Sequence, residues 1–460
     1  MMFKKLAFCF FVLFIGIEHQ VLLGQNQLFD SLTLSNQRVY ISLEDALKEP
    51  EKVYRLDLSS YGTDTWGDKS SILTELPESI GKLYNLQELD LSDNQLTALP
   101  KEIGDLKNLQ YLYLQTNQLK SLPATIGKLA NLKRLNLEAN RLIFLPIELK
   151  GLTSLVALDL DHNSFNSFPE TITQLSNLEE LSMHSNSLQS LPSQIGSLKK
   201  LKNLEIWDNH IMTLPEEIAG LTNLLRLDVS SNSLTNLPAG IGKLEKITSL
   251  NLTENSLPML PSSIGNLKSL MNVDLSYNVL STLPADIGNL AQLKILDLTS
   301  NHLASLPVSI GKLTNLEQLD LNINKLAFIP KEISNLSKIK ELVLFQNELT
   351  ALPAEIGKMS NLVSIDLNTN KLAMLPSEIG KLANVQVLVL WGNKLTSLPN
   401  EICTMSNLMA IELQDNQIVK LPACINKISN LIKIDLSHNK VAAEEKKRLT
   451  DLFPSAQLDF

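Results

Sequence analysis

The sequence predicts an α/β fold built as a stack of flat coils around one continuous core, and two observations carry this prediction. Asparagine recurs every 23 residues without a slip from Asn94 to Asn439, and proline keeps the same step from Pro77 to Pro422. Within each unit, the spacing of apolar residues changes from two to three. Constant spacing over this length means that every unit is the same structural step, since one inserted residue would shift every later coil.

A single unit shows both spacings. The segment "ELDLS" at 88–92 alternates apolar and polar residues, which is typical of a short strand. The segment "PKEIGDLKNL" at 100–109 has apolar residues three apart, which suits a helical or 3₁₀ turn with proline at its first position. One coil cannot cover its inward-pointing apolar side chains, so neighbouring coils must stack. Each fully buried Leu or Ile then contributes roughly 1.5–3 kcal/mol before conformational entropy is subtracted.

The recurring asparagine is predicted to be structural. Where the chain turns out of the strand, backbone groups leave the sheet and point toward the core. An amide both donates and accepts hydrogen bonds, so it can satisfy these groups within its coil and toward the next. The ladder comprises Asn94, Asn117, Asn140, Asn163, Asn186, Asn209, Asn232, Asn255, Asn278, Asn301, Asn324, Asn347, Asn370, Asn393, Asn416 and Asn439.

The phrase "LxxLDLSxNxLxxLPxxIGxLxNL", which the chain carries at 86–109, resembles the leucine-rich repeat in its short class with Leu-Pro after the asparagine. The resemblance covers residues 53–440. It implies a leucine-rich repeat solenoid, or horseshoe, with a parallel β-sheet on the concave side and short helical or 3₁₀ turns on the convex side. It also implies that the concave side binds another macromolecule.

The N-terminal residues differ in kind from the repeats. Residues 1–24 combine two lysines with an apolar run from Leu6 to Ile17, which is typical of a secretory signal peptide and short for a transmembrane helix. We therefore expect a protein that is secreted or held in the cell envelope. An uncleaved segment that anchors the chain to a membrane is the alternative.

Two caps are expected to shield the ends of the solenoid. Residues 25–52 form the N-terminal cap, with a short helix that Ser42 begins. The solenoid at 53–440 has about 17 repeats, the first of them irregular because of an insertion around Trp66. Residues 441–460 form the C-terminal cap, with a polar-faced helix, a proline stop and a last strand.

Charge and cysteine content narrow the class of partner. The net charge of −9 argues against nucleic-acid binding, which needs a basic stripe. Cys403 and Cys424 lie on neighbouring coils, but their repeat positions differ by two residues. This offset favours two thiols over a disulfide, although pairing stays open. The cysteine-rich caps of many extracellular animal and plant relatives are missing, so the chain looks more like a bacterial exported member.

Alternation along the strands predicts which side chains are exposed. If Leu112 and Leu114 face the core, Tyr111 and Tyr113 face out, onto the concave sheet that the resemblance implies. The exposed columns then lie six, four, two and one residues before each ladder asparagine. The column four before is mostly acidic, and it is either a solvated row or a stripe that steers a basic partner. Its acids are Asp90, Asp159, Glu205, Asp228, Asp274, Asp297, Asp320, Asp366, Glu412 and Asp435.

Apolar departures from the acidic column predict the principal contact site. Val343 and Val389 replace the acid, and Phe345 and Trp391 follow two residues later, with Ile323 nearby. Exposed apolar side chains in a polar column are typical of a binding hot spot, although drift between repeats is the alternative. Three lysines border this surface, namely Lys325, Lys371 and Lys394.

A second group of side chains predicts a further contact zone of aromatic character. It comprises Tyr111, Tyr113, His162, His184, Trp207 and Tyr277. The two histidines lie near Asp161, but these groups look too spread to hold a metal ion, which needs converging ligands at about 2 Å. We therefore expect no metal and no cofactor.

The sequence thus predicts an exported, non-catalytic interaction module that binds a protein partner, of basic character, on its concave face. A membrane-anchored envelope or adhesion scaffold is the alternative, as is an intracellular signalling scaffold if the N-terminal segment is not a signal. An enzyme is not expected, because an open acidic sheet lacks the pocket that glycoside hydrolysis needs, and no phosphate loop or nucleophile motif occurs. The partner, the organism and the oligomeric state stay open.

Overall fold

The computed structural model describes residues 28–60 and 72–460 of the chain. They divide into two compact units, of which unit 1 ends at Ile206 and unit 2 comprises Trp207–Phe460. The predicted signal peptide and the insertion around Trp66 lie outside the described residues. The predicted limits between caps and solenoid remain predictions.

Each unit carries a parallel sheet whose strands follow chain order. In unit 1 the strands are β1 (Val39–Tyr40), β2 (Arg55–Asp57), β3 (Glu88–Asp90), β4 (Tyr111–Tyr113), β5 (Arg134–Asn136), β6 (Ala157–Asp159), β7 (Glu180–Ser182) and β8 (Asn203–Glu205). In unit 2 they are β9 (Arg226–Asp228), β10 (Ser249–Asn251), β11 (Asn272–Asp274), β12 (Ile295–Asp297), β13 (Gln318–Asp320), β14 (Glu341–Val343), β15 (Ser364–Asp366), β16 (Val387–Val389), β17 (Ala410–Glu412), β18 (Lys433–Asp435) and β19 (Gln457–Asp459). Leu89 pairs with Leu112, and Leu112 pairs with Leu135, so equal repeat positions stand in columns.

A short 3₁₀ helix follows nearly every strand. Unit 1 contains η1 (Pro50–Lys52), η3 (Glu78–Lys82), η4 (Lys101–Asp105), η5 (Ala124–Lys128), η6 (Ile147–Gly151), η7 (Glu170–Gln174) and η8 (Ser193–Ser197). Unit 2 contains η9 (Glu216–Gly220), η10 (Ala239–Lys243), η11 (Ser262–Asn266), η12 (Ala285–Asn289), η13 (Val308–Lys312), η14 (Lys331–Asn335), η15 (Ala354–Lys358), η16 (Ser377–Lys381), η17 (Asn400–Thr404) and η18 (Ile425–Lys427).

The repeated proline immediately precedes the 3₁₀ helix. The sequence had predicted that it would be the first residue of the helix. Pro100 keeps an extended ψ of 152°, and its carbonyl accepts the N–H of Ile103 at 3.1 Å. The fixed φ of proline thus directs the chain into the turn, while the missing N–H is not needed there.

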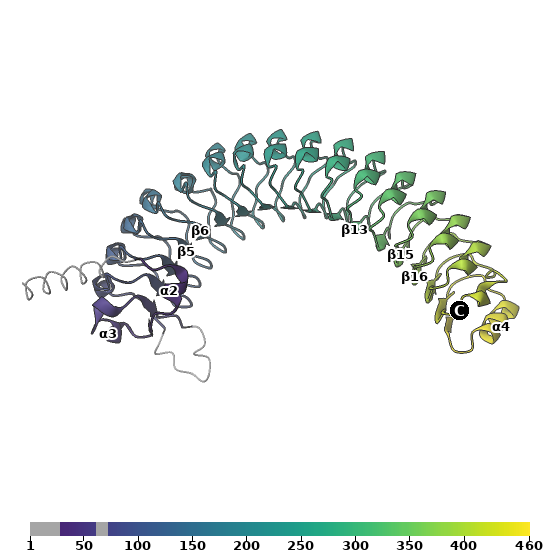
Figure 1. Ribbon diagram of the computed structural model, residues 1–460, viewed down its shortest axis with the longest axis horizontal. Coiled ribbons are helices and arrows are strands. Elements are labelled where there is room, and N and C mark those ends of the chain that lie inside the picture. Colours follow the sequence, from purple (N-terminus) through teal and green to yellow (C-terminus); the bar gives the residue numbers. More distant parts are fainter. Residues whose placement is uncertain (1–27, 61–71) are drawn as a thin grey trace, which may run out of the picture. The chain divides into compact units, whose positions relative to one another are not determined.

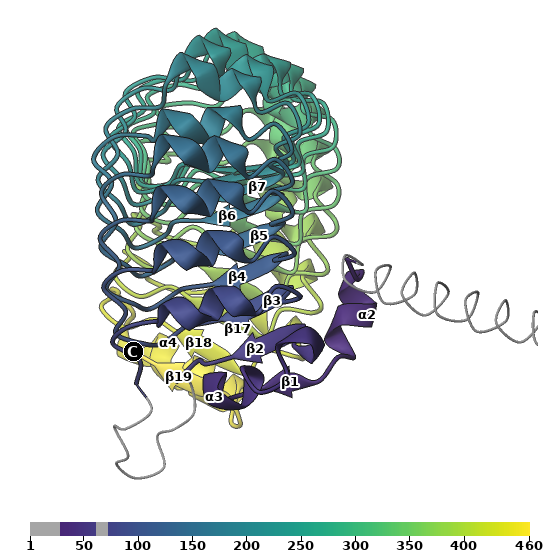
Figure 2. The same ribbon diagram turned by 90° about the vertical axis from the view of Figure 1, so that its left-hand side faces the viewer.

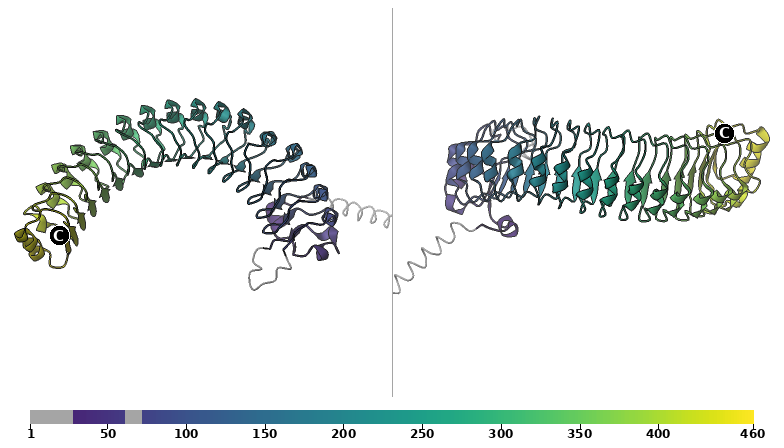
Figure 3. Two further views of the ribbon diagram at one scale, coloured as in Figure 1. Left: turned by 180° about the vertical axis from the view of Figure 1, so that it is seen from behind. Right: turned by 90° about the horizontal axis from the view of Figure 1, so that it is seen from above.

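Within each unit, the strands line the concave side and the 3₁₀ helices lie on the convex side (Figure 1). The 3₁₀ helices of unit 1 stack above one another in front of the strands (Figure 2), and those of both units form regular rows (Figure 3). Leucine and isoleucine rungs fill the space between the two layers: Leu89, Leu91, Leu96 and Ile103 are all fully buried. The predicted parallel solenoid is confirmed.

The ladder asparagines join neighbouring coils. The Nδ2 group of Asn117 donates to Leu114 O in its own coil at 3.1 Å and to Leu91 O in the preceding coil at 2.9 Å. Its Oδ1 accepts the N–H of Leu96 at 2.9 Å. The bonds therefore reach the preceding coil, whereas the sequence analysis expected the next one. The residue before each ladder asparagine is left-handed, with φ between 49° and 68°.

A second asparagine column, which sequence reasoning missed, joins the coils behind the 3₁₀ helices. Asn108 donates to Tyr84 O and Asn131 donates to Lys107 O, both at 2.9 Å. The same bond recurs in unit 2, where Asn384 donates to Ser360 O at 2.8 Å. An asparagine before the apolar residue that follows many of the 3₁₀ helices, as in Asn108-Leu109, was the signal for it.

The convex turns pack most closely at a glycine. A Cβ atom on Gly265 would lie 2.4 Å from Asp286 O, and one on Gly288 would lie 2.3 Å from Ser309 O. Each glycine thus faces the residue 21 positions later, because the contact between turns runs diagonally.

Cys403 and Cys424 follow this same diagonal contact. They are 21 residues apart, their Cα atoms are 5.9 Å apart, and they form a disulfide. The expectation of two thiols is therefore wrong: an offset of two repeat positions brings residues of adjacent turns together.

The ends contain the short helix after Ser42, the C-terminal helix and the last strand that the sequence predicts, together with α2 (Ser31–Ser35) and β1, which it did not predict. Helix α2 precedes β1, and α3 (Leu43–Ala46) begins after Ser42, whose hydroxyl accepts the N–H of Asp45. Helix α4 (Ala443–Leu452) buries Leu449, and β19 extends the sheet beside β18. Across residues 28–60 and 72–460, no helix combines the length and apolar character needed to cross a membrane.

Candidate interaction surface

Most aspartates of the acidic column close the turn that follows their strand. Asp274 Oδ1 accepts the backbone N–H of Ser276 at 2.9 Å, and Asp366 Oδ1 accepts that of Asn368 at 3.1 Å. The same bond joins Asp90 to Ser92, Asp228 to Ser230, Asp297 to Thr299 and Asp435 to Ser437. These acids therefore have a structural role that sequence reasoning missed, although an acid two residues before a small polar residue was the available signal.

Burial also affects the pKa of acids in this column. It raises the pKa of Asp90, Asp320 and Asp366, because each carboxylate loses part of its hydration against the sheet. The negative stripe is therefore partly desolvated.

In unit 2, the structure places the predicted apolar residues at the ends of β13, β14 and β16 or in the turns that follow them. We name Ile323, Val343, Phe345, Val389 and Trp391 the apolar patch. Val343 pairs in register with Asp366, which pairs with Val389, so β15 separates the two valines. Trp391 is 37% exposed, and the other four side chains are half-buried. The rings are thus open to solvent on one side.

Ile323 holds an uncommon conformation at the edge of this patch. Its φ is +54°, in the left-handed region that a β-branched residue rarely adopts. Its N–H donates to Phe345 O at 3.0 Å, which fixes it beside the next coil. A hollow of about 300 Å³ adjoins it, lined by His302, Lys325 and Gln346 among others. Of the bordering lysines, Lys371 forms an ion pair with Glu348 at 2.9 Å.

The second predicted group is divided between the two units. Tyr111 and Tyr113 alternate with buried Leu112 on β4 and are half-buried, and burial raises the pKa of Tyr113. His162 and His184 also belong to unit 1. Trp207 and Tyr277 belong to unit 2, where Tyr277 is 56% exposed and Trp207 is half-buried.

A contact that sequence reasoning did not predict joins His184 to Asp161. His184 Nε2 lies 2.8 Å from Asp161 Oδ2, and the His184 N–H donates to Oδ1 at 2.7 Å. Ser182 Oγ lies 2.6 and 2.8 Å from the two carboxylate oxygens. The His162 ring meets the His184 ring edge-on, with centroids 4.9 Å apart.

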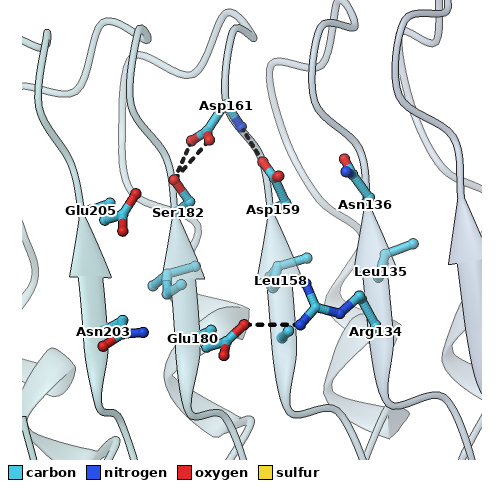
Figure 4. Close-up of a pocket in the computed structure, with 12 residues that line it drawn as sticks. Arg134, Leu135, Asn136, Leu158, Asp159, Asp161, Glu180, Ser182, Asn203 and Glu205 are labelled. Carbon is cyan, nitrogen blue, oxygen red and sulfur yellow. Dashed lines mark hydrogen bonds and ion pairs between the residues drawn. The ribbon is translucent and has the colours of Figure 1, made fainter. Parts of the chain in front are cut away.

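Beside this contact lies a hollow of about 190 Å³ on the concave face of unit 1 (Figure 4). Ala157 and Ser182 open it, because their side chains are small. Arg134 spans the hollow to reach Glu180, at 3.0 Å. Asp159, Asp161 and Glu205 add negative charge to its walls. It is an open, polar depression and not an enclosed pocket.

The arrangement does not assemble a catalytic nucleophile. A serine is activated when histidine accepts its proton, but Ser182 donates to Asp161, and the histidine contacts the same carboxylate. In the described part of the chain, no three His, Cys, Asp or Glu side chains converge as metal ligands.

Comparison with known proteins gives the family. The family model described as "Leucine-rich repeat region" matches residues 68–185, 124–208, 181–256 and 283–371. The one described as "Leucine rich repeat" matches residues 383–441. No enzyme family is indicated by these matches, and no curated protein sequence matches the chain.

Solved structures agree with the family models. A leucine-rich repeat protein of Leptospira interrogans is 39% identical over 92% of this chain and 100% of its own, with a TM-score of 0.70. A plant peptide hormone receptor, solved with RGF2, is 32% identical over 79% of this chain and 65% of its own, with a TM-score of 0.66. YopM from Yersinia enterocolitica is 25% identical, covering 87% and 85%, with a TM-score of 0.58. The chain belongs to the leucine-rich repeat family.

Proposed function

We propose that this chain is an exported, non-catalytic interaction module that binds a protein partner on its concave face, with the apolar patch as the principal contact. The observation that carries the proposal is the pair Val343 and Val389. Aspartates at the same position in other coils accept a backbone N–H, and valine cannot. Each valine thus gives up a hydrogen bond of about 0.5–1.5 kcal/mol.

What replaces that hydrogen bond is exposed apolar surface. Val343 and Val389 end β14 and β16, and Phe345 and Trp391 follow two residues later, so each of these coils presents a valine and a ring that are both partly exposed. Partly exposed aromatic side chains next to β-branched residues are what a partner buries at the centre of an interface. Each valine loses a structural hydrogen bond and adds apolar surface. Selection for binding explains this combination better than random variation between repeats does.

One structural neighbour supports binding as the use of this architecture, and a second shows the same fold. The plant peptide hormone receptor was solved with RGF2, and Toll was solved in a complex with Spätzle. The second neighbour is 24% identical and supports only the likeness of fold.

Charge supports a partner of basic character. The acidic column continues through both units, and in unit 1 the hollow gathers Asp159, Glu180 and Glu205 against the single charge of Arg134. A surface of this kind attracts lysine- and arginine-rich partners and raises the rate of encounter.

Export is supported by the composition of the N-terminal residues and by the disulfide. Disulfides persist in oxidising compartments, and Cys403 and Cys424 are bonded. The secreted or envelope location is therefore part of the proposal.

The test is binding of a partner captured from the extracellular medium. The double variant Phe345→Ala, Trp391→Ala is expected to bind at least about tenfold more weakly, because two anchoring rings are lost. The matched control is Phe144→Ala, which removes a ring that is 52% exposed in unit 1 and lies after ladder Asn140, away from the strands. If the double variant binds the partner as tightly as wild type, the apolar patch is not the principal contact site.

A membrane-anchored envelope or adhesion scaffold is the second candidate, because residues 6–17 form an apolar run. N-terminal sequencing of the mature protein decides between them. A start near Gln25 supports release from the membrane, and an intact Met1 supports the anchor.

A further inference from the structure

The hollow of unit 1 borders a buried carboxylate. Asp161 is 6% exposed, and it is the only Asp or Glu that the fold buries within residues 28–60 and 72–460. It occupies the column two before ladder Asn163, where the coil of β3 carries Ser92 and the coil of β9 carries Ser230. A buried carboxylate at this place requires partners that replace its water.

All of these partners come from the next coil. Ser182 donates to both carboxylate oxygens, and His184 contributes its backbone N–H and its Nε2 atom. The carboxylate therefore ties the coil of β6 to the coil of β7. His184 is held in turn by the edge of the His162 ring and by Ser185 Oγ, which lies 3.2 Å from Nδ1.

A second carboxylate stands beside the first. Asp159 Oδ1 accepts the N–H of Asp161 at 3.1 Å. Burial raises the pKa of Asp159 to about 6, and the charge of Asp161 adds to this effect. Burial likewise raises the pKa of Asp161 to about 6, although the hydrogen bonds from Ser182 and His184 act in the opposite direction.

The other charges around the pair come from three strands or the turns that follow them. Arg134 and Glu138 belong to the coil of β5, Glu180 to β7 and Glu205 to β8. Arg134 pairs with Glu180 across the hollow, so this cation on its walls is already engaged by a carboxylate.

We propose that Asp159, Asp161 and His184 form a pH-sensitive switch in the concave face of unit 1, which removes negative charge from the hollow and rearranges the tie between the coils of β6 and β7 as the pH falls from 7 to 5. The inference rests on the proposed function, since it concerns how binding of a basic partner is regulated.

The chemistry of the carboxylate explains the rearrangement. An ionised carboxylate accepts only, so Asp161 satisfies Ser182 and both His184 groups at once. A protonated carboxyl carries one O–H donor, which competes with the N–H and O–H groups that point at it. Ser182 Oγ or His184 Nε2 must then become the acceptor, so the direction of at least one hydrogen bond to the coil of β7 changes. At the same time about two negative charges leave the hollow, and its attraction for a basic partner weakens.

The first experiment follows the free protein. Carbon-13 spectra of labelled aspartate, recorded from pH 4 to pH 8, are expected to show two carboxyl groups with midpoints near pH 6, one of which is absent in Asp161→Asn. The ring resonances of His184 are expected to move over the same range. Two midpoints below pH 4.5, or a His184 ring that does not change between pH 5 and pH 7, overturn the switch.

The second experiment uses tetralysine as a cationic probe, measured calorimetrically at one ionic strength. Wild-type affinity is expected to fall about fivefold or more from pH 7.5 to pH 5, with protons released on binding near pH 6. Asp159→Asn keeps the acceptor oxygen, as Asn136 does on the neighbouring strand, and is expected to flatten this profile. Asp274→Asn, in the same column of unit 2, is expected to retain it.

A profile that is the same in wild type and Asp159→Asn contradicts the switch. Failure of the switch can be distinguished from failure of the proposed function. The carboxyl titration needs no partner, and the partner test uses Phe345 and Trp391 in unit 2.

Discussion

Asp159 and Asp161 in unit 1 occupy the same two columns, four and two before a ladder asparagine, as Val343 and Phe345 in unit 2. In unit 1 both positions carry acids that bond backbone N–H groups, and one of them is buried. In the coil of β14 in unit 2, both positions are apolar and partly exposed. The same backbone thus supports a polar contact between coils in one unit and an apolar surface in the other.

The difference teaches where the repeat allows variation. Asn163 beside the acids and Asn347 beside the phenylalanine make the same bonds, each to the preceding coil and to its own. These asparagine hydrogen bonds, which we call the frame, are therefore the same in both coils. Only the residues in the outward-facing columns differ. A departure in those columns that also gives up a structural bond is the most informative about function.

The largest effect is expected from the frame itself. Asn163→Ala and Asn347→Ala should each destabilise their unit by about 2–4 kcal/mol, since buried N–H and C=O groups lose their partners. The free energy of unfolding, measured with denaturant, checks this, and exposed Asn236→Ala serves as a control with little effect. If one ladder variant is neutral and the other is not, the two regions do not share a frame.

The disulfide between Cys403 and Cys424, on the convex side, gives a third region for comparison. Cys403→Ser with Cys424→Ser should destabilise the last coils by about 3 kcal/mol, because a loop of this length is no longer closed in the unfolded chain. Hydrogen exchange should quicken around η17 and η18 and stay unchanged around η11 and η12, where glycine makes the same diagonal contact. Uniform exchange in both places would show that the disulfide is not a local clamp.

A smaller effect is expected at the acids of unit 1. The raised pKa of Asp159 means that the folded state binds a proton at a higher pH than the unfolded state, whose pKa is near 3.8. Wild type therefore loses stability as the pH rises from about 4 through 6. Asp159→Asn should stabilise unit 1 by about 1 kcal/mol at pH 7.5 and by little at pH 4. The matched variant Asp274→Asn, whose coil carries Ser276 in place of a second acid, should gain less at pH 7.5.

The sequence predicted the contacts that follow from the residue pattern of one repeat unit. The alternation around Leu112, the rungs such as Ile103 and the amide ladder all follow from one unit and its exact repetition. The sequence did not reveal contacts that depend on the offset between coils. The pairing of Cys403 with Cys424 and the bond from Ser182 to Asp161 both need the diagonal step, which only stacked coordinates show.

Nor did the sequence show the second role of the acids. Alternation placed Asp274 on the exposed face, but its bond to the N–H of Ser276 depends on the turn geometry after the strand. For the same reason, Val343 and Val389 could be seen as apolar, whereas the hydrogen bond that they give up could not.

The most direct test of the account is the double variant Val343→Asp, Val389→Asp, measured for both stability and binding. The aspartates should restore the missing acceptors, so the free energy of unfolding of unit 2 should stay equal or rise by up to about 1 kcal/mol. Affinity for the captured partner should fall at least about tenfold, because two charges enter the apolar patch. A variant that binds the partner as well as wild type would contradict the assignment of this surface.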